Sequence, residues 1–331
     1  MRTLIRYRSA LLAAAAVACA LSSGSEPAAK IDPATWGSDH VGKPIPEYVT
    51  GDECLFCHRN DVGPSWSKNR HQRTIREVET GSASVVALNE SADYKQFAKD
   101  VTLQLGGDRC TRFAKRSKAY GKLDLLNVAR DASDPGKGGK LRALDGKARW
   151  DTTTFAESCA GCHATGVDSA SEAFSVVALD CVTCHGVVPA EHSKDTKLVY
   201  FSKKREDPAR VVTSICASCH IRSGKSKSTG RPYPNNFVAG DNLFRDFQVD
   251  LSATALAGLN PADRHVLENV RDVVVLGKDD VTCVSCHDVH KRSSKKHAAV
   301  AENDSCVTCH NETGSKKKRK TYEVHSKTCQ Y

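Results

Sequence analysis

Six short segments of the chain share the pattern Cys-x-x-Cys-His, and we number them motifs 1 to 6 in chain order. Their cysteines are Cys54 and Cys57, Cys159 and Cys162, Cys181 and Cys184, Cys216 and Cys219, Cys283 and Cys286, and Cys306 and Cys309, and their histidines are His58, His163, His185, His220, His287 and His310. Two thiols at this spacing can each form a thioether with a vinyl group of one haem, while the adjacent imidazole binds the iron. The pattern therefore predicts six covalently bound haem c groups.

Zinc sites and disulfides are the other structures that repeated Cys-x-x-Cys pairs can form. Zinc held by two such pairs has four ligands already and does not need a histidine after every second cysteine. Disulfides do not need that histidine either. The fixed position of the histidine therefore favours haem attachment.

The sixth coordination position of each iron needs a second ligand from elsewhere in the chain. The only methionine is Met1, which rules out the Met/His ligation of high-potential carriers. The histidines outside the motifs are His40, His71, His192, His265, His290, His297 and His325. We therefore expect bis-histidine haems of low potential, with His40 as the weakest candidate because it lies in a predicted tether.

The N-terminus has the features of an export signal. Three arginines precede an apolar run from Ala10 to Leu21, which is too short to span a membrane, and cleavage after Ala20 fits the small residues there. We expect residues 1–20 to be a signal peptide and the protein to be periplasmic. Lipidation at Cys19 is an alternative that would anchor it to a membrane, and an extracellular location is another.

The net charge of +9 is that of the whole chain without haem, so it does not by itself indicate an acidic binding partner. Three of these charges belong to leader arginines, and each haem with ionised propionates adds about −1 when ferric or about −2 when ferrous. We therefore expect no nucleic-acid partner, but redox partner proteins that donate and accept electrons. Basic runs at 203–205, 295–296 and 316–320 are either solvated surface or a docking patch for an acidic partner.

The elements that position the motifs divide the chain into regions. Residues 21–49 are rich in Pro, Ser, Gly and Ala and predict a flexible tether, residues 50–270 contain motifs 1 to 4, and residues 271–331 contain motifs 5 and 6. The haem-free interval 60–158 alternates apolar and polar residues around Gly106-Gly107, which predicts a small antiparallel β unit near 100–130. Asn260 and Pro261 predict the start of a helix.

The chain has few large side chains with which to build a conventional apolar core, because aromatic residues make up 6% of it. We therefore expect a mainly α fold with many loops, organised by stacked haems, and a haem-free chain that lacks a stable fold. Two cysteines remain outside the motifs and the leader, Cys110 and Cys329. They could form a disulfide or stay unpaired, and Cys329 could also be a relic of a further attachment site.

The residues that follow the motifs resemble a known family. Motif 1 is followed by Trp66 and His71, motif 2 by Ala164-Thr165-Gly166, motif 3 by Gly186 and His192, and motif 4 by Ile221-Arg222. In this order they resemble the tetrahaem cytochrome that accepts electrons from hydroxylamine oxidoreductase, and the wider group of secreted multihaem cytochromes. The resemblance covers roughly residues 50–270. Motif 5 with His290 is similar to the common CxxCH-x-x-His module of multihaem proteins.

This resemblance implies that distal histidines come from the segments of other haems. The implied pairs are His71 with His185, His192 with His58, and His265 with His220. The resemblance also implies an open sixth position on the haem of His163. Two of His290, His297 and His325 would then serve the last two haems.

Electron transfer between partner proteins is the function that the sequence favours, because closely spaced haems need no substrate pocket for it. An enzyme that reduces or oxidises a small nitrogen or sulfur species at an open haem near His163 is an alternative. A subunit of a conducting filament, or an oligomer formed through haem-exposing surfaces, is another.

Overall fold

The computed structural model describes residues 36–48, 50–79, 81–107, 110–131, 139–277 and 282–290. Motifs 1 to 5 lie in these ranges. The predicted features outside them are the signal peptide with Cys19, motif 6, His297, His325, Cys329 and the basic runs at 295–296 and 316–320. Among the helices in the described ranges, none is long and apolar enough to cross a membrane.

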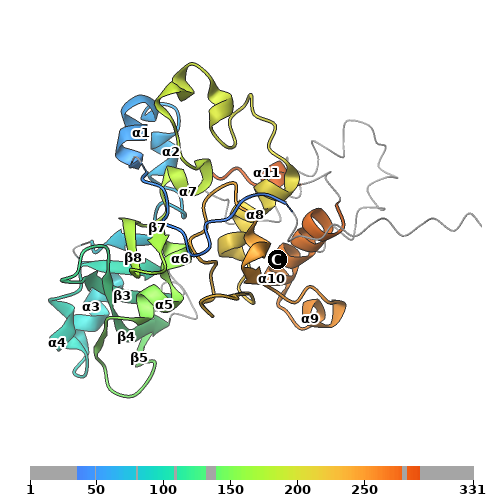
Figure 1. The fold of residues 1–331 in the computed structure, drawn as a ribbon. Helices are drawn as coiled ribbons and strands as arrows, with labels where there is room; N and C mark the ends of the chain where they lie inside the picture. The colour runs from blue at the N-terminus through green and yellow to red at the C-terminus, as the bar shows by residue number, and fades with distance from the viewer. Residues whose placement is uncertain are drawn as a thin grey trace, which may run out of the picture.

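A six-stranded antiparallel sheet fills the interval between motifs 1 and 2, at the lower left of Figure 1. Its strands are β1 (Ile75–Glu77), β2 (Leu103–Gly106), β3 (Cys110–Arg116), β4 (Leu123–Asp131), β5 (Lys140–Ala143) and β6 (Trp150–Asp151). The order is β1-β2-β3-β4-β5, and β6 pairs with an earlier part of β4 than β5 does. Gly106 turns the chain at φ +83°, where a Cβ atom would lie 2.3 Å from the Cys110 carbonyl oxygen.

One face of this sheet is covered by α3 (Ala83–Glu90) and α4 (Lys95–Ala98). The buried side chains between them are Phe113, Leu126 and Val128 from the sheet and Leu88 and Ala98 from the helices. These side chains are 6% exposed or less. The sheet therefore has an apolar core of its own, which the low aromatic content of the chain did not predict.

The opposite face of the sheet carries the segment of motif 2. This segment consists of α5 (Thr154–Ser158), α6 (Ala160–His163) and the hairpin of β7 (Ala164–Asp168) and β8 (Ala173–Val177). Phe155 and Ala160 are buried against Ile75, Leu105 and Leu125. The sheet thus fixes the position of motif 2.

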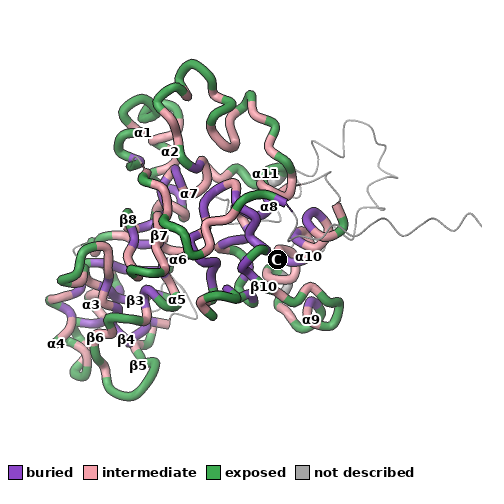
Figure 2. The backbone as a smooth tube through the Cα atoms, viewed as in Figure 1, coloured by how far each residue is buried: buried purple, intermediate pink, exposed green. Residues whose placement is uncertain are grey.

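The other motifs lie on helices outside the sheet region. The helices that carry them are α1 (Gly51–His58), α7 (Cys181–His185), α8 (Ala209–His220) and α11 (Cys283–Cys286). Along the chain, α2 (Gly63–Trp66) follows α1, and the 3₁₀ turns η1 (Ala190–Ser193) and η2 (Thr196–Leu198) lie between α7 and α8. Around α8 pack β9 (Lys225–Ser226), η3 (Leu243–Arg245), β10 (Phe247–Gln248), α9 (Ala253–Ala257), α10 (Pro261–Val270) and the π-helical turn η4 (Arg271–Val275). Their buried core includes Ile221, Phe247 and Leu267. In Figure 2 the buried residues of this core are the purple segments near the middle of the molecule.

The predicted tether differs from the structure where the structure describes it. Trp36 is 7% exposed and belongs to the core around α8, and Ser38 pairs with Asp241 in a parallel bridge. The Arg245 side chain donates to the Gly37 carbonyl at 2.8 Å. Residues 36–48 are therefore a fixed part of the fold, because polar composition does not exclude docking through backbone hydrogen bonds.

The predicted fold class agrees with the structure in outline, which has helices, small antiparallel sheets and many loops. The helix at Asn260 is confirmed, since the Asn260 side chain accepts from the Asp263 N–H at 3.1 Å. The β unit extends from residue 75 to residue 151, further than the predicted 100–130. The added strands β1, β5 and β6 are short edge strands with charged residues, so apolar alternation does not mark them.

Candidate haem sites

Each motif in the described ranges lies on or at the end of a helix. The five helices are α1, α6, α7, α8 and α11. Residues three and four apart share one face of a helix, so in α1, α7 and α8 both thiols and the imidazole of the motif point to the same side. This arrangement is the one that two thioether bonds and one axial ligand to a single haem require.

Asp180 ties motif 1 to motif 3. Its side chain accepts from the backbone N–H of Cys181 at 2.6 Å, which caps α7, and from the N–H of Gly51 at 2.7 Å, which begins α1. A Cβ atom on Gly51 would lie 2.0 Å from an Asp180 oxygen, so only glycine fits there. The thiols of Cys54 and Cys181 lie beside each other and interact.

Two further pairs of motifs meet through their thiols. The Cys162 thiol of motif 2 donates to the Cys219 carbonyl of motif 4 at 3.7 Å, and the Cys219 thiol donates to the Gly161 carbonyl at 3.5 Å. The Cys216 thiol of motif 4 lies beside that of Cys283 in motif 5 and interacts with it. Motif 4 therefore adjoins two other motifs directly.

Motif 3 also lies beside motif 4. The Cys184 thiol is half-buried and lies close to the thiols of Cys216 and Cys219. Burial raises the pKa of the Cys184 thiol to about 12. The five described motifs thus form one connected group with motif 4 at its junction.

Three of the motif histidines are oriented through one ring nitrogen. Nδ1 of His185 lies 2.6 Å from the Tyr200 carbonyl oxygen, Nδ1 of His163 lies 3.4 Å from the Thr74 carbonyl oxygen, and Nδ1 of His58 lies 3.2 Å from the Asp61 carboxylate. A hydrogen bond at Nδ1 fixes the ring and leaves Nε2 to bind a metal. Tyr200 and Asp61 are positioning residues that the motif pattern alone does not identify.

Two of the candidate distal histidines lie opposite motif histidines. The ring centroids of His71 and His220 are 6.1 Å apart, and those of His185 and His290 are 5.9 Å apart. Two imidazoles on one iron have centroids about 6 Å apart, because each metal–nitrogen bond is about 2 Å and the centroid lies about 1 Å further. Both pairs therefore have the separation of a bis-histidine haem.

These pairs differ from the ones that the family resemblance implies. His71 faces His220 rather than His185, whereas the resemblance pairs His220 with His265. His290 faces His185 instead. The reason lies in motif 5, whose segment is absent from a four-haem chain. The Asn69 side chain donates to the Val289 carbonyl at 2.6 Å, and this contact holds the His71 loop and the motif 5 segment together.

The ligation of His192 and His265 remains a prediction. His192 lies on η1, with Nδ1 2.8 Å from the Pro189 carbonyl oxygen, which again leaves Nε2 available. His265 is half-buried on α10. His287 and His290 flank the C-terminal side of α11.

Burial lowers the pKa of His71, His163, His185 and His220 below the ordinary value for histidine. The neutral imidazole is the form that binds iron, so burial favours the ligating state. In the described ranges, no group of three or more His, Cys, Asp or Glu side chains is arranged to hold a metal ion. Paired thiols followed by a neutral imidazole are the donors that covalent haem attachment uses.

The middle of motif 2 is tightly packed. A Cβ atom on Gly161 would lie 2.2 Å from the ring of Tyr233, which is 2% exposed and whose hydroxyl donates to the Ala156 carbonyl. A cleft with a volume of about 740 Å³ lies between α1, the 116–122 turn and β8. Its lining contains no motif cysteine or histidine.

Asp151 caps α5 and so supports motif 2. Its carboxylate accepts from the N–H groups of Thr154 at 2.7 Å and Thr153 at 2.9 Å, and these bonds lower the pKa of Asp151 to about 2. We expect Asp151→Ala to lower the free energy of unfolding by about 1 kcal/mol at neutral pH, since the group is largely exposed. A depressed carboxyl pKa stabilises the fold above its unfolded value near 4 and ceases to do so as pH falls through about 2.

Chemical denaturation of the holoprotein near neutral pH and near pH 2 checks this expectation. The difference in the free energy of unfolding between Asp151→Ala and the natural protein should be smaller at the lower pH. Lys147→Ala, at an exposed residue nearby, should have the free energy of unfolding of the natural protein at both pH values. An equal difference for Asp151→Ala at both pH values would contradict the capping role.

Comparison with known proteins agrees with this geometry. A family model described as a doubled CXXCH motif matches residues 275–313, and one described as cytochrome c554 and c-prime matches residues 131–186. The chain is therefore similar to multihaem c-type cytochromes. The multiheme cytochrome MtrA of Shewanella baltica (strain OS185) is 28% identical to it over 178 residues, which are 48% of this chain and 46% of that protein.

A solved structure, the undecaheme cytochrome from the S-layer of Carboxydothermus ferrireducens, aligns with 82% of this chain at a TM-score of 0.43 and 17% identity. The aligned part is 44% of that chain. The matched part of this chain therefore covers less than half the length of each of these two relatives.

Proposed function

We propose that this protein carries six haems and passes electrons between redox partner proteins on the far side of the cytoplasmic membrane. The observation that carries the proposal is the set of thiol contacts that join motif 1 to motif 3, motif 2 to motif 4, and motif 4 to motif 5. Each of these thiols is a point of attachment to the edge of a haem. Thiols in contact therefore bring the edges of neighbouring haems together.

A haem iron accepts and releases one electron at a time. The protein supplies what makes this useful, namely short separations and ligands that set the potentials. Motif 4 adjoins motifs 2, 3 and 5, so an electron that enters at motif 1 can pass through motif 3 to motif 4 and leave in either of two directions. A contiguous array of this kind supports conduction rather than chemistry at one site.

The ligands favour low potentials. His71 and His290 are proposed as distal ligands of the haems of His220 and His185, on the basis of their ring separations. His192 is proposed for the haem of His58, as the family resemblance implies. His265, His297 and His325 are the candidates for motifs 5 and 6.

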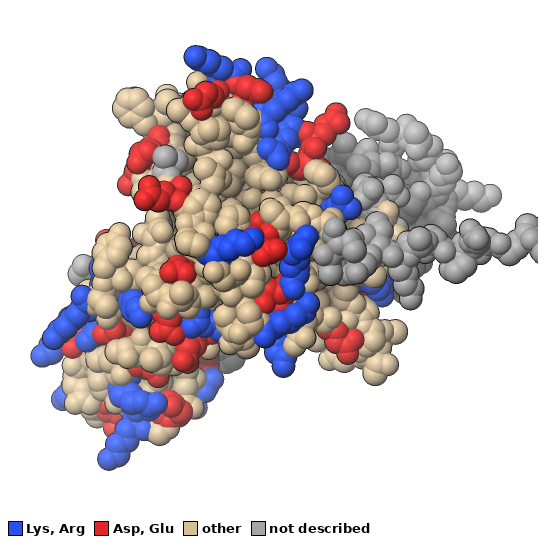
Figure 3. Space-filling model, in the orientation of Figure 1, with Lys and Arg blue, Asp and Glu red and all other residues tan. Residues whose placement is uncertain are grey.

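Motif 1 is the proposed docking end of the array. Phe56, in the middle of the motif, is 83% exposed, and His58 is exposed as well. Figure 3 shows acidic side chains over the region of α1, where Asp52, Glu53 and Asp61 are located. These features suit a redox partner with a basic surface.

The basic run at 203–205 is less available for docking than its composition suggests. The Arg205 side chain donates to Asp207 at 2.6 Å and lies 3.8 Å above the ring of Tyr200. Lys203 and Lys204 remain exposed. The export signal predicted over residues 1–20 supports a periplasmic location, where c-type haem is attached.

Intact-mass measurement combined with reductive titration tests the proposal. We expect six haem additions per mature chain and uptake of six electrons from a low-potential one-electron donor. A variant with Cys306 and Cys309 both changed to Ser should lose one haem and one electron. Fewer than five haems on the natural protein, or haems that the donor does not reduce, would overturn the proposal.

A further inference from the structure

His40 and Asp241 form a buried pair at the edge of the helical region. The two carboxylate oxygens of Asp241 lie 3.0 and 2.8 Å from Nδ1 of His40. Asp241 also accepts from the Ser38 hydroxyl at 3.2 Å and from the Val238 N–H at 3.0 Å. The carboxylate side chain is 4% exposed and that of His40 is 27% exposed. Asp241 thus holds the His40 ring at Nδ1, and the ring is partly exposed to solvent.

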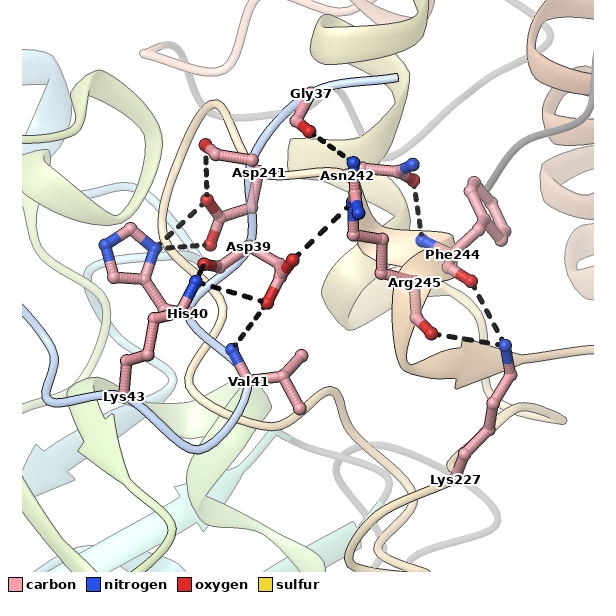
Figure 4. A network of polar contacts seen from close by, with 11 residues as sticks. Gly37, Asp39, His40, Val41, Lys43, Lys227, Asp241, Asn242, Phe244 and Arg245 are labelled. Atoms are coloured by element: carbon pink, nitrogen blue, oxygen red, sulfur yellow. Dashed lines mark hydrogen bonds and ion pairs between the residues drawn. The ribbon is translucent and has the colours of Figure 1, made fainter. Parts of the chain in front are cut away.

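The segment that carries His40 is fixed to the fold at several points. The Asn242 N–H donates to the Ser38 carbonyl at 2.8 Å, and the Asn236 side chain donates to the Lys43 carbonyl at 2.6 Å. Figure 4 shows the second ring nitrogen of His40 directed away from Asp241. Nε2 is therefore presented in a defined direction by a rigid support.

This arrangement has the form of a metal-binding histidine with its supporting carboxylate. Such ligands usually donate the other ring N–H to a carboxylate or a carbonyl, which fixes the tautomer and strengthens the metal bond. His163 and His185 are held through Nδ1 in the same manner. An ion pair that only anchors the segment is the competing explanation, and it requires nothing of Nε2.

The surroundings of His40 point to motif 2. Ile45 lies 3.6 Å from the Cβ position of Gly166, in the strand that directly follows His163. Asn236, which holds Lys43, also accepts from the Ser169 N–H at 2.7 Å. Tyr233 of the same loop packs on Gly161 inside motif 2. The 36–48 segment and the 233–241 loop therefore both lie along α6 and β7.

We propose that His40, supported by Asp241, is the sixth ligand of the haem attached at Cys159 and Cys162, opposite His163. His71 and His290 already face other motif histidines, so neither is available for this iron. With His40 bound, the position that the tetrahaem resemblance leaves open is closed, and the haem of motif 2 conducts electrons without binding small molecules. The proposal rests on haem attachment at motif 2, which intact mass measures separately.

Removal of the imidazole tests the assignment. His40→Ala is expected to convert one haem per chain from low spin to high spin in the ferric electron paramagnetic resonance spectrum, and to raise cyanide binding from none to one per chain. A crystal structure of the adduct should place the cyanide on the iron of His163. Ser38→Ala is the matched control, since it removes another donor to Asp241 and leaves the imidazole in place; it should change neither signal.

Two further variants keep the test decisive if the alanine variant folds poorly. His40→Met should give one haem with a thioether ligand and a more positive potential, because Met/His ligation raises it. Asp241→Asn should keep all haems low-spin and shift one potential in the positive direction, because the imidazole loses its anionic support. A purely structural pair would lower stability in these variants without either spectral change.

The proposal is overturned if His40→Ala leaves the spin states and cyanide binding unchanged, or if the natural protein already contains a high-spin haem that binds cyanide. It is also overturned if the cyanide lies on an iron other than that of His163. Six haems and complete reduction in every variant would show that the electron-transfer function stands independently of this outcome.

Discussion

His71→Ala is expected to convert the haem of motif 4 from low spin to high spin and to raise its potential. The His71 ring lies opposite His220 at a separation of 6.1 Å, which fits two ligands on one iron. Loss of one imidazole removes a strong-field donor, and axial ligands control haem potentials over a range of roughly 0.8 V. We therefore expect a shift on the order of 0.1 V at this haem.

The effect should extend beyond one haem because motif 4 is the junction of the array. Its thiols contact those of motifs 2 and 5, and Cys184 of motif 3 lies beside them. A more positive haem at the junction would retain electrons that normally pass on. In stopped-flow reduction the variant should show one fast phase that accounts for the haems of motifs 1, 3 and 4, followed by a slower one.

A crystal structure of the cyanide adduct identifies the altered iron. Cyanide on the iron of His220 supports the pairing that the ring geometry favours, and cyanide on the iron of His185 would restore the pairing implied by the tetrahaem resemblance. Gln72→Ala is the matched control, since Gln72 is adjacent in sequence and lines the cleft beside α1 rather than facing a motif histidine. It should leave every haem low-spin.

Local features of the sequence predicted the parts of this molecule that local chemistry determines. The spacing of Cys159, Cys162 and His163 is sufficient to identify a haem attachment site, and Asn260 is sufficient to begin a helix. The turn at Gly106 and the alternating residues on each side likewise predicted β2 and β3. These features depend on neighbours within a few positions, so a single sequence contains them.

The distal ligands and the N-terminal segment depend on contacts between distant residues. Asn69 reaches Val289 across 220 positions, and His40 reaches Asp241 across 201. Neither contact leaves a periodic signal in the sequence. The resemblance to a four-haem chain supplied ligand pairs instead, and these did not account for a fifth motif that places His290 opposite His185.

Asp180 is a case in which a local signal was present but incomplete. An aspartate directly before a helix predicts a cap, and it does cap α7. The second hydrogen bond, to Gly51, is what aligns motifs 1 and 3, and it requires knowledge of which helices are neighbours. The residues that connect the haem sites are therefore harder to predict than the residues that hold each haem.

A chain without haem is expected to lose structure around the motifs and to keep the sheet. In α1 and α7 the only buried residues are Gly51 and Val182, so these helices have little apolar contact of their own. A buried aromatic side chain covers 150–250 Å², and a porphyrin is larger, so each haem buries roughly 300 Å² and contributes about 7 kcal/mol. The net stability of a whole domain is only about 5–15 kcal/mol. Loss of several haems therefore exceeds what the remaining contacts supply.

The sheet is different because its core is complete without haem. Phe113, Leu125, Leu126 and Val128 are fully buried between helices on one face and the motif 2 segment on the other. We expect a chain that lacks residues 1–20, with serine in place of every motif cysteine, to give a protease-resistant fragment that begins near Ile75 and extends through β4. Segments 50–58, 181–205 and 282–290 should be cut rapidly.

Limited proteolysis with mass spectrometry, together with amide hydrogen exchange, measures this division. The holoprotein under the same conditions is the control and should resist cleavage in all of these segments. A haem-free chain that melts in one cooperative transition and protects α1 and α7 as strongly as β4 would contradict the expectation, because it would mean that the polypeptide positions the motifs before haem is attached. Rapid cleavage within β3 and β4 would contradict it in the opposite way, because the sheet would then also depend on haem for its stability.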